Sequence, residues 1–420
     1  MFLVGPLIAP DTASYIEGDF TRPPLYPLLI SSISHFNESE NLWIIMGFQM
    51  LFGGYSAWSL CQWMANEYKT KPAINSILYF ILISPYLTWD LWIGNYILSE
   101  SLAYPLYLLV NRYIFEGIAT KNIKPFLISL VITVFLVLTR KQFLFIYPAF
   151  LITCFIFINS KDSIRKISYI IIGVIISFSS ATMIERVYTY VKHGYWAGIP
   201  VSGMQFITPQ LYLANNKDIS YITTNEAKHY FESVITELEQ QGLTLDSSDP
   251  YILKSLGKYG LFSNNYNPIL HAAIKHALKE ADENKIVNDI NLYTDKLMRG
   301  VAFELLKINI EKNIKIYVFN ILNGFSGNFS VGMYYPLLLI SITLLIIINL
   351  ICIGNASLYL IWIVSFVMHL GNVMAVALVQ PTMIRYTFYT STILVLLSIL
   401  FIGNGLIKDM SQNSKRNILN

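Results

Sequence analysis

The sequence predicts an all-α, polytopic membrane protein with about 9–10 transmembrane helices, amphipathic interfacial helices and a mostly helical extracytoplasmic region. Hydrophobic residues make up 54% of the 420 residues and charged residues only 13%, whereas a soluble domain carries about 25% charged residues. The mean hydropathy is +0.50, and the apolar residues gather in runs long enough to cross a hydrocarbon core of ~30 Å. The net charge of +3 is small and dispersed, so nothing indicates nucleic acid as a partner.

Nine apolar runs predict nine spans. The fourth and fifth runs are short and share a polar tip at residues 140–142, so we interpret them as a hairpin. The third run places Glu100 about two turns inside its span. The nine runs cover residues 42–65, 73–89, 94–113, 125–139, 142–158, 167–185, 334–353, 357–379 and 387–407.

The chain opens with the apolar stretch MFLVGPLIAP. As a helix these residues would rise about 15 Å, which is half of a bilayer core. The stretch lacks the basic segment and the cleavage site of a signal peptide. We therefore expect it to form the outer half of a first span whose inner half is missing.

Basic residues in the short loops predict the orientation of the chain. In the nine-span arrangement, four basic segments lie on one side, which is then cytoplasmic and includes the C-terminal tail. The extracytoplasmic side holds an outer loop at 11–41, the tip at Arg140 and the long segment 187–332. The basic residues of the cytoplasmic side are Lys69, Lys71, Arg112, Lys121, Lys124, Lys161, Arg165, Lys166, Lys408, Lys415 and Arg416.

These boundaries divide the chain into three predicted segments. Residues 1–186 form an N-terminal transmembrane module, and residues 187–332 form the extracytoplasmic, mostly helical region. Residues 333–420 form a C-terminal transmembrane module with a cytoplasmic tail. The middle segment has about 145 residues of mixed charge, enough to bury a small core of its own.

Helical patterns recur within the extracytoplasmic region, near residues 225–241, 268–285 and 286–313. At its end, residues 301–325 carry apolar side chains at helical spacing with lysines on the other face. That pattern predicts a helix lying on the membrane surface before the chain returns to the bilayer.

Several ionisable residues fall near the outer membrane boundary: Asp11, Glu100, Arg140, Lys141 and Arg385. A carboxylate inside a span costs a few kcal/mol, which favours a functional role. Structural alternatives remain open. Glu100 could pair with Arg140 or Arg385 as an ion pair, and Asp11 could be a solvated residue at a helix end.

Carboxylates and arginines at one boundary suit the transfer of a sugar from a lipid phosphate. A carboxylate can take a proton from an acceptor hydroxyl as general base. Arginines bind phosphate through paired hydrogen bonds and stabilise the charge that grows on a departing phosphate. No glycine-rich nucleotide loop is evident, which favours a lipid-linked donor over a nucleotide sugar. Clustered carboxylates also suit a divalent cation, although no cofactor is required.

The opening stretch DTASYIEGDFTRPPLYPLLI resembles the first outer loop of GT-C glycosyltransferases, a superfamily that includes the protein O-mannosyltransferases and the bacterial aminoarabinose transferases. In that loop an acid follows the first span, a tyrosine comes a few residues later, and an Arg/Lys-Pro-Pro element leads into a helix. Asp11, Tyr15 and Arg22-Pro23-Pro24 stand at those positions. The Arg-Pro-Pro-Leu-Tyr-Pro form is most similar to the bacterial, family-39-like branch.

Three shorter elements resemble later parts of the same enzymes. ILSESL at 97–102 is similar to the element that opens their fourth span, with Glu100 as a second acid. LTRKQF at 138–143 resembles their outward arginine tip, and IRYTFYTSTILVL at 384–396 resembles an Arg-Tyr element before a late span. The resemblance implies a GT-C-type bundle.

The resemblance also implies roles for these residues. Asp11 would be the general base, and Glu100 would orient the base, bind the acceptor or help to hold a metal. Many relatives carry an Asp-Glu pair where Thr12 follows Asp11, so Glu17 or Asp19 could contribute to the base. The expected substrate-binding residues are Tyr15, Asp19, Arg22, Arg140, Lys141, Arg385 and Tyr386.

The predicted protein is therefore an inverting glycosyltransferase in a cell membrane, with its active site on the extracytoplasmic side. Its partners would be a polyprenyl-phosphate-sugar donor, membrane lipid and a glycan, lipid or protein acceptor. One alternative is a transporter or flippase for a lipid-linked or anionic solute, which would need a polar path through the bundle. Another is a polysaccharide polymerase or ligase with a large outer loop.

Overall fold

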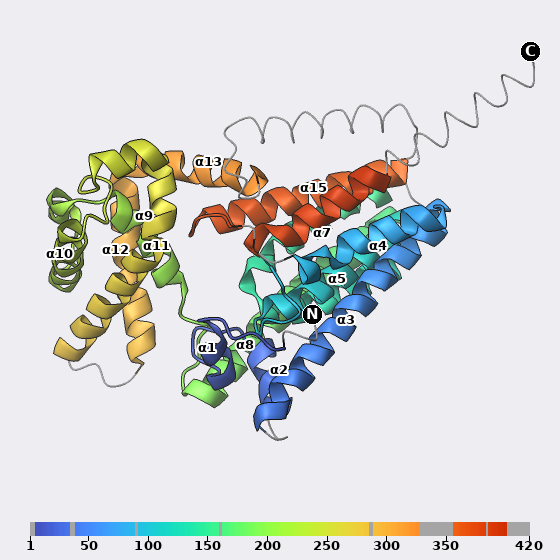
Figure 1. The fold of residues 1–420 in the computed structure, drawn as a ribbon, viewed down its shortest axis with the longest axis horizontal. Helices are drawn as coiled ribbons and strands as arrows, with labels where there is room; N and C mark the ends of the chain where they lie inside the picture. Colours follow the sequence, from blue (N-terminus) through green and yellow to red (C-terminus); the bar gives the residue numbers. More distant parts are fainter. Residues whose placement is uncertain are drawn as a thin grey trace, which may run out of the picture. The chain divides into compact units, whose positions relative to one another are not determined.

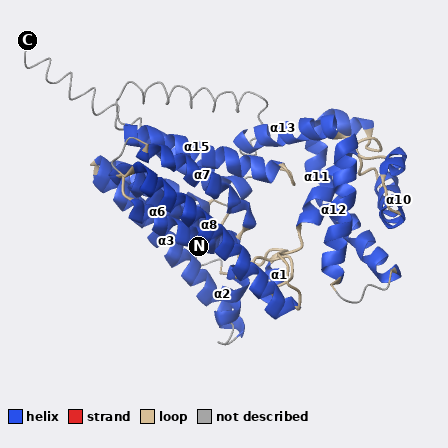
Figure 2. Ribbon diagram, turned by 180° about the vertical axis from the view of Figure 1, so that it is seen from behind, coloured by secondary structure: helices blue, strands red, loops and turns tan. Residues whose placement is uncertain are grey.

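In the residues that the computed structural model describes, the long regular elements are all helices, joined by turns and loops (Figure 1). One isolated parallel bridge joins Leu7 to Tyr96, and the described residues contain no other strand pairing (Figure 2). The predicted span at 334–353, the end of the last predicted span and the C-terminal tail lie outside the described residues. The described residues are 5–33, 38–88, 91–158, 162–284, 289–326, 356–383 and 385–400.

The chain divides into two compact units. The first unit holds the described residues of Met1–Tyr188, Leu337–Asn372 and Arg385–Asn420, and the second holds those of Thr189–Pro336 and Val373–Ile384. Each unit has its own buried core.

The first unit is built from apolar helices and from short helical turns near the chain start. A further helix, Arg385–Leu400, follows α15 in the chain, and both α8 and α15 run across the boundary between the units. The labelled elements are α1 (Thr12–Glu17), α2 (Leu25–Ile33), α3 (Glu38–Tyr68), α4 (Pro72–Leu87), α5 (Glu100–Thr120), α6 (Ile123–Thr139), η1 (Lys141–Phe145), α7 (Ile146–Thr153), η2 (Cys154–Phe157), α8 (Ser163–His193) and α15 (Ala356–Ala377).

Three helices in the described part of the chain are long and apolar enough to cross a membrane: Asn41–Tyr68, Ser163–His193 and Ser357–Ala377. They contain the predicted runs 42–65 and 167–185 and most of 357–379. On α8, large apolar side chains such as Ile172, Ile175 and Ile176 are exposed, a pattern that suits contact with lipid. Shorter apolar helices cover Pro72–Leu87, Ile123–Thr139, Lys141–Phe157 and Arg385–Leu400.

The opening apolar stretch does not form half of a span, and that prediction is wrong for residues 5–10. These residues are extended, because Gly5 has a positive φ of 75° and both Pro6 and Pro10 lack an N–H for helical bonding. The Leu7 N–H donates to the Asn95 carbonyl at 2.8 Å, and the Ile97 N–H donates to the Leu7 carbonyl at 3.1 Å. The stretch is thus held by backbone pairing to the segment before α5.

The predicted span at 94–113 also begins too early. Residues 94–99 are turns and extended chain, because their backbone groups bond to the opening stretch and to the Trp92 carbonyl. Helix α5 begins at Glu100, so this carboxylate lies at a helix N-terminus, and not two turns inside a span. A negative charge at that end is favoured by the helix dipole.

Helix α5 is the central helix of the first unit, with most of its residues buried. It packs closely on α6 at Gly117, where an added Cβ would lie 2.6 Å from the Phe126 ring. Near its start, Tyr104 and Tyr107 pack against aromatic side chains of the Arg385–Leu400 helix, including Tyr389. This packing fixes the helix that carries Glu100 against the helix that begins with Arg385.

The second unit is a set of helices around an apolar core that includes Tyr212, Phe231 and Leu305. The predicted surface helix at 301–325 is not continuous, since the chain breaks at Asn309. Its first part packs into the core, whereas its second part leaves Ile310, Ile314 and Val318 exposed. The elements are α9 (Ser202–Leu213), η3 (Asn216–Tyr221), α10 (Asn225–Gln240), α11 (Pro250–Glu283), α12 (Ile290–Ile308) and α13 (Ile310–Ser326).

Candidate functional site

Asp11 reaches the start of α5 through the backbone pairing of the opening stretch. The Thr12 hydroxyl continues this pairing by donating to the Ile97 carbonyl at 3.1 Å, and the same oxygen accepts the Ala9 N–H at 2.9 Å. Asp11 precedes α1 but makes no side-chain cap to that helix. Its carboxylate is therefore left to face other groups.

The two oxygens of Asp11 face two arginines from opposite ends of the chain. Arg22 Nη2 lies 2.9 Å from Oδ1, and Arg385 Nη2 lies 3.3 Å from Oδ2. Arg22 is oriented by Ser14, whose hydroxyl accepts its Nε–H at 2.7 Å, and by the Tyr15 ring below its guanidinium. The Asp11 side chain stays 37% exposed, so its carboxylate is accessible from solvent.

Glu100 is the buried member of the same cluster. Its side chain is only 4% exposed, and Oε1 lies 2.7 Å from Arg140 Nη1 and 3.1 Å from Arg385 Nη2. Arg385 therefore bridges Glu100 and Asp11. We call Asp11, Arg22, Glu100, Arg140 and Arg385 the carboxylate–arginine cluster.

Two tyrosines line this cluster. The Tyr15 hydroxyl is hydrogen-bonded to Ser99 Oγ at 2.8 Å, and Ser99 also accepts a hydrogen bond from Arg140 at 3.2 Å. Burial raises the pKa of the Tyr15 hydroxyl, which keeps this residue neutral. The ring centre of Tyr386 lies 5.5 Å from the Arg140 guanidinium carbon and 5.1 Å from that of Arg385, within the range of cation–π attraction.

A cavity of about 310 Å³ opens beside the cluster. Glu100, Ser101 and Arg385 provide its polar groups. The remaining wall comes mainly from apolar side chains of the opening stretch and of the segment before α5. These other lining residues are Ile8, Ala9, Pro10, Leu91, Ile93, Tyr96 and Leu98.

The charge of the cluster suits an anion. Three guanidinium groups face two carboxylates, which leaves one positive charge in excess. A divalent cation placed between Asp11 and Glu100 would meet Arg385, which occupies the position between them. The arrangement of these side chains does not fit the divalent cation considered from the sequence.

Two predicted substrate-binding residues contact other partners. Lys141 Nζ lies 2.6 Å from Glu185 Oε1 on α8, so this lysine ties the arginine tip to that helix. Asp19 Oδ1 accepts the backbone N–H of Thr21 at 2.8 Å and its hydroxyl at 2.6 Å, which closes a local turn. Asp11, Tyr15, Arg22, Glu100, Arg140, Arg385 and Tyr386 do come together.

Sequence reasoning missed three polar residues that support the cluster. Ser99 bonds both Tyr15 and Arg140, Gln142 bonds Arg140, and Asn372 bonds the backbone beside Arg385. Ser99 and Gln142 stand next to recognised residues in ILSESL and LTRKQF, which was an available signal. Asn372 lies inside an apolar run, where an amide needs a partner, but the sequence does not show which one.

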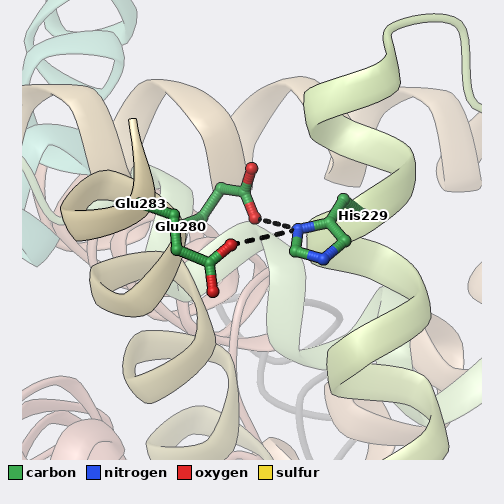
Figure 3. Close-up of side chains that lie close together, drawn as sticks. All are labelled: His229, Glu280 and Glu283. Atoms are coloured by element: carbon green, nitrogen blue, oxygen red, sulfur yellow. Dashed lines mark hydrogen bonds and ion pairs between the residues drawn. The ribbon is translucent and has the colours of Figure 1, made fainter. Parts of the chain in front are cut away.

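One group of side chains in the second unit has the composition of a metal site (Figure 3). His229 on α10 faces Glu280 and Glu283 on α11, with ligand atoms within 4.8 Å of one another. His229 Nδ1 and Glu280 Oε2 are 2.6 Å apart, whereas two ligands of a tetrahedral zinc ion lie roughly 3.3 Å apart, given bonds of about 2.0–2.1 Å. The distance is that of a charge-assisted hydrogen bond, so we interpret the group as an ion pair between two helices.

In comparisons with known proteins, no protein-family model, no curated protein and no solved structure matches this chain.

Proposed function

We propose that this protein is a membrane-embedded glycosyltransferase of the GT-C type, which moves a sugar from a polyprenyl-phosphate donor to a glycan, lipid or protein acceptor. One observation carries the proposal: Arg385 bridges Asp11 and Glu100 at the wall of a cavity. A purely structural ion-pair network could also contain the ion pairs of Arg385 with Asp11 and Glu100. It would not require the exposure of Asp11 and Arg385, at 37% and 38%, next to a cavity.

Asp11 is the residue best placed to act as general base. Both carboxylates pair with two guanidinium groups, but the Asp11 side chain is 37% exposed and the Glu100 side chain only 4%. In the proposed step, Asp11 takes the proton of the acceptor hydroxyl while the acceptor oxygen bonds to the anomeric carbon of the sugar. The bond from that carbon to the phosphate oxygen breaks, and its electron pair leaves on the phosphate. This single displacement inverts the anomeric centre.

The arginines of the cluster would hold the phosphate. Arg385 is partly exposed and borders the cavity, and Arg22 lies on the other oxygen of Asp11. Guanidinium groups bind phosphate oxygens through paired hydrogen bonds and stabilise the charge of the leaving group. The single excess positive charge of the cluster matches one phosphodiester anion. In this arrangement Glu100 orients the arginines.

A lipid-linked substrate also suits the surroundings. The described helices include three that are long and apolar enough to cross a membrane. The cavity wall is mostly apolar, so it can receive the prenyl units next to the phosphate. Basic residues in the short loops favour an extracytoplasmic site and a cytoplasmic C-terminus.

Sugar transfer in proteoliposomes tests the proposal. A panel of radiolabelled polyprenyl-phosphate sugars is supplied to the wild type and to Asp11→Asn, and the label in acceptors and in released sugar is counted. We expect transfer or slow donor hydrolysis with the wild type and neither with Asp11→Asn. Donor that crosses the bilayer with its glycosidic bond intact would instead indicate a transporter and overturn the proposal.

A further inference from the structure

The side-chain amide of Gln142 connects Arg140 to the backbone next to Arg385. Its Oε1 accepts the Nε–H of Arg140 at 3.2 Å. Its Nε2 donates to the Tyr386 carbonyl at 3.2 Å and to Asn372 Oδ1 at 3.4 Å. One amide therefore contacts the tip that carries Arg140 and the first turn of the helix that begins with Arg385.

Asn372 on α15 completes this arrangement. Its Nδ2 donates to the same Tyr386 carbonyl at 2.9 Å and to the Thr390 hydroxyl at 3.2 Å. The Tyr386 carbonyl thus accepts two amide hydrogen bonds, from two separate segments. Since Tyr386 directly follows Arg385, these bonds fix the backbone from which the Arg385 side chain extends.

The two arginines need such support because they carry like charges at short range. Arg140 and Arg385 approach the same oxygen of Glu100, at 2.7 and 3.1 Å, and both lie against the Tyr386 ring. Two guanidinium groups sharing one carboxylate oxygen repel each other. If a phosphate binds between the two guanidinium groups, their separation determines whether both can form hydrogen bonds to its oxygens.

We propose that Gln142 and Asn372 are positioning residues, which set the separation of Arg140 and Arg385 for one phosphate group. This inference rests on the proposed function in naming phosphate as the ligand. The positioning itself rests on the hydrogen bonds of the two amides. Gln142 acts mainly on Arg140, and Asn372 acts on Arg385 through the Tyr386 carbonyl.

Binding of undecaprenyl phosphate to the full-length protein in detergent tests the inference. Gln142→Met keeps the side-chain length and removes the hydrogen bonds. We expect it to weaken binding about tenfold, because misplaced contacts lose much of their value. In an Arg140→Gln background, Gln142→Met should weaken binding by less than about twofold, because the guanidinium group that Gln142 positions is already absent. Equal effects in both backgrounds would overturn the inference.

The matched control is Gln62→Met, the same change at an exposed amide on α3, which should leave binding unchanged. Structure determination of Gln142→Met separates this inference from the proposed function. If the wild type binds no lipid phosphate, the proposed function fails, and the position of Arg140 still decides the inference. Displacement of its guanidinium from Glu100 supports positioning by Gln142, and an unchanged Arg140 refutes it.

Discussion

Arg385 Nη2 lies 3.3 Å from Asp11 Oδ2, although 374 positions separate the two residues in the chain. The same nitrogen lies 3.1 Å from Glu100 Oε1. The first loop, the start of α5 and the start of the Arg385–Leu400 helix therefore meet at one guanidinium group. This meeting point joins an accessible carboxylate to a buried one.

The first prediction concerns the general base. Asp11→Asn should lower the transfer rate by about 10²–10⁴-fold, the usual contribution of a general base. Asp19→Asn is the matched control, because its amide oxygen can still accept from Thr21, and the Asp19 residue meets Arg22 only through its backbone carbonyl, which the substitution keeps. Initial rates in proteoliposomes check the pair. An equal loss in both variants would contradict the assignment of Asp11.

The second prediction concerns the buried carboxylate. Glu100→Gln should lower the free energy of unfolding by about 3–5 kcal/mol, because it leaves the Arg140 charge buried without its partner. Glu116→Gln removes a part-exposed ion pair with Arg112 and should cost less than about 1 kcal/mol. Denaturant unfolding in detergent measures both. A loss for Glu100→Gln as small as the control's would refute a tightly paired Glu100.

The third prediction concerns the pH dependence of the second unit. The hydrogen bond that the protonated His229 ring donates to the Glu280 carboxylate raises the pKa of His229, whose side chain is 54% exposed. The stabilisation is therefore fully present below the ordinary histidine pKa of about 6.5 and is lost as pH rises through the raised value. Melting temperatures of wild type and His229→Gln should differ most at low pH. A difference that grows with pH would contradict the ion pair.

A neighbouring ion pair between α10 and α11 should have the opposite pH dependence. Hydrogen bonds from Lys275 and then His276 lower the pKa of Glu237. Its stabilisation is present above the ordinary glutamate pKa and is lost as pH falls through the lowered value. The melting-temperature difference between wild type and Glu237→Gln should therefore shrink below about pH 4.3. A constant difference at acid pH would show that this pairing does not stabilise the unit.

The fifth prediction concerns the packing of α9 on α12. An added Cβ at Gly203 would lie 2.1 Å from the Asp295 carbonyl oxygen, and the Gly203 N–H donates to the Asp295 carboxylate at 2.6 Å. Gly203→Ala should destabilise the protein by about 1–3 kcal/mol through overpacking. Gly300→Ala, in open space on α12, should stabilise it by up to about 1 kcal/mol. Thermal unfolding of both variants decides whether this contact is close.

The sequence was informative where a property is local. Hydropathy alone located the helices around 42–65, 167–185 and 357–379, since long apolar runs need no partner to be recognised. The GT-C resemblance selected Asp11, Glu100 and other residues that the fold does bring together. Gly5, Pro6 and Pro10 are local signals for the extended opening stretch, since glycine and proline both disfavour a helix, whereas its apolar composition alone suits half of a span.

The membership of the cluster and the start of α5 depend on contacts between segments that are distant in the chain, and the sequence does not show these contacts. Lys141 and Arg140 are adjacent and equally basic, yet only Arg140 joins the cluster, because Lys141 pairs with Glu185 on α8. No sequence pattern distinguishes the two. The sequence also does not predict that α5 begins at Glu100. The residues before Glu100 form hydrogen bonds to a stretch about 90 positions earlier, and hydropathy does not reveal that pairing.

The most direct test of the central claim is the structure of the full-length protein with undecaprenyl phosphate bound. We predict that the phosphate lies within about 3 Å of Arg385 and of at least one of Arg22 and Arg140, the distance of a charge-assisted hydrogen bond. The prenyl chain should begin in the cavity beside Glu100. A phosphate bound elsewhere, with Arg385 still bridging Asp11 and Glu100, would contradict the account.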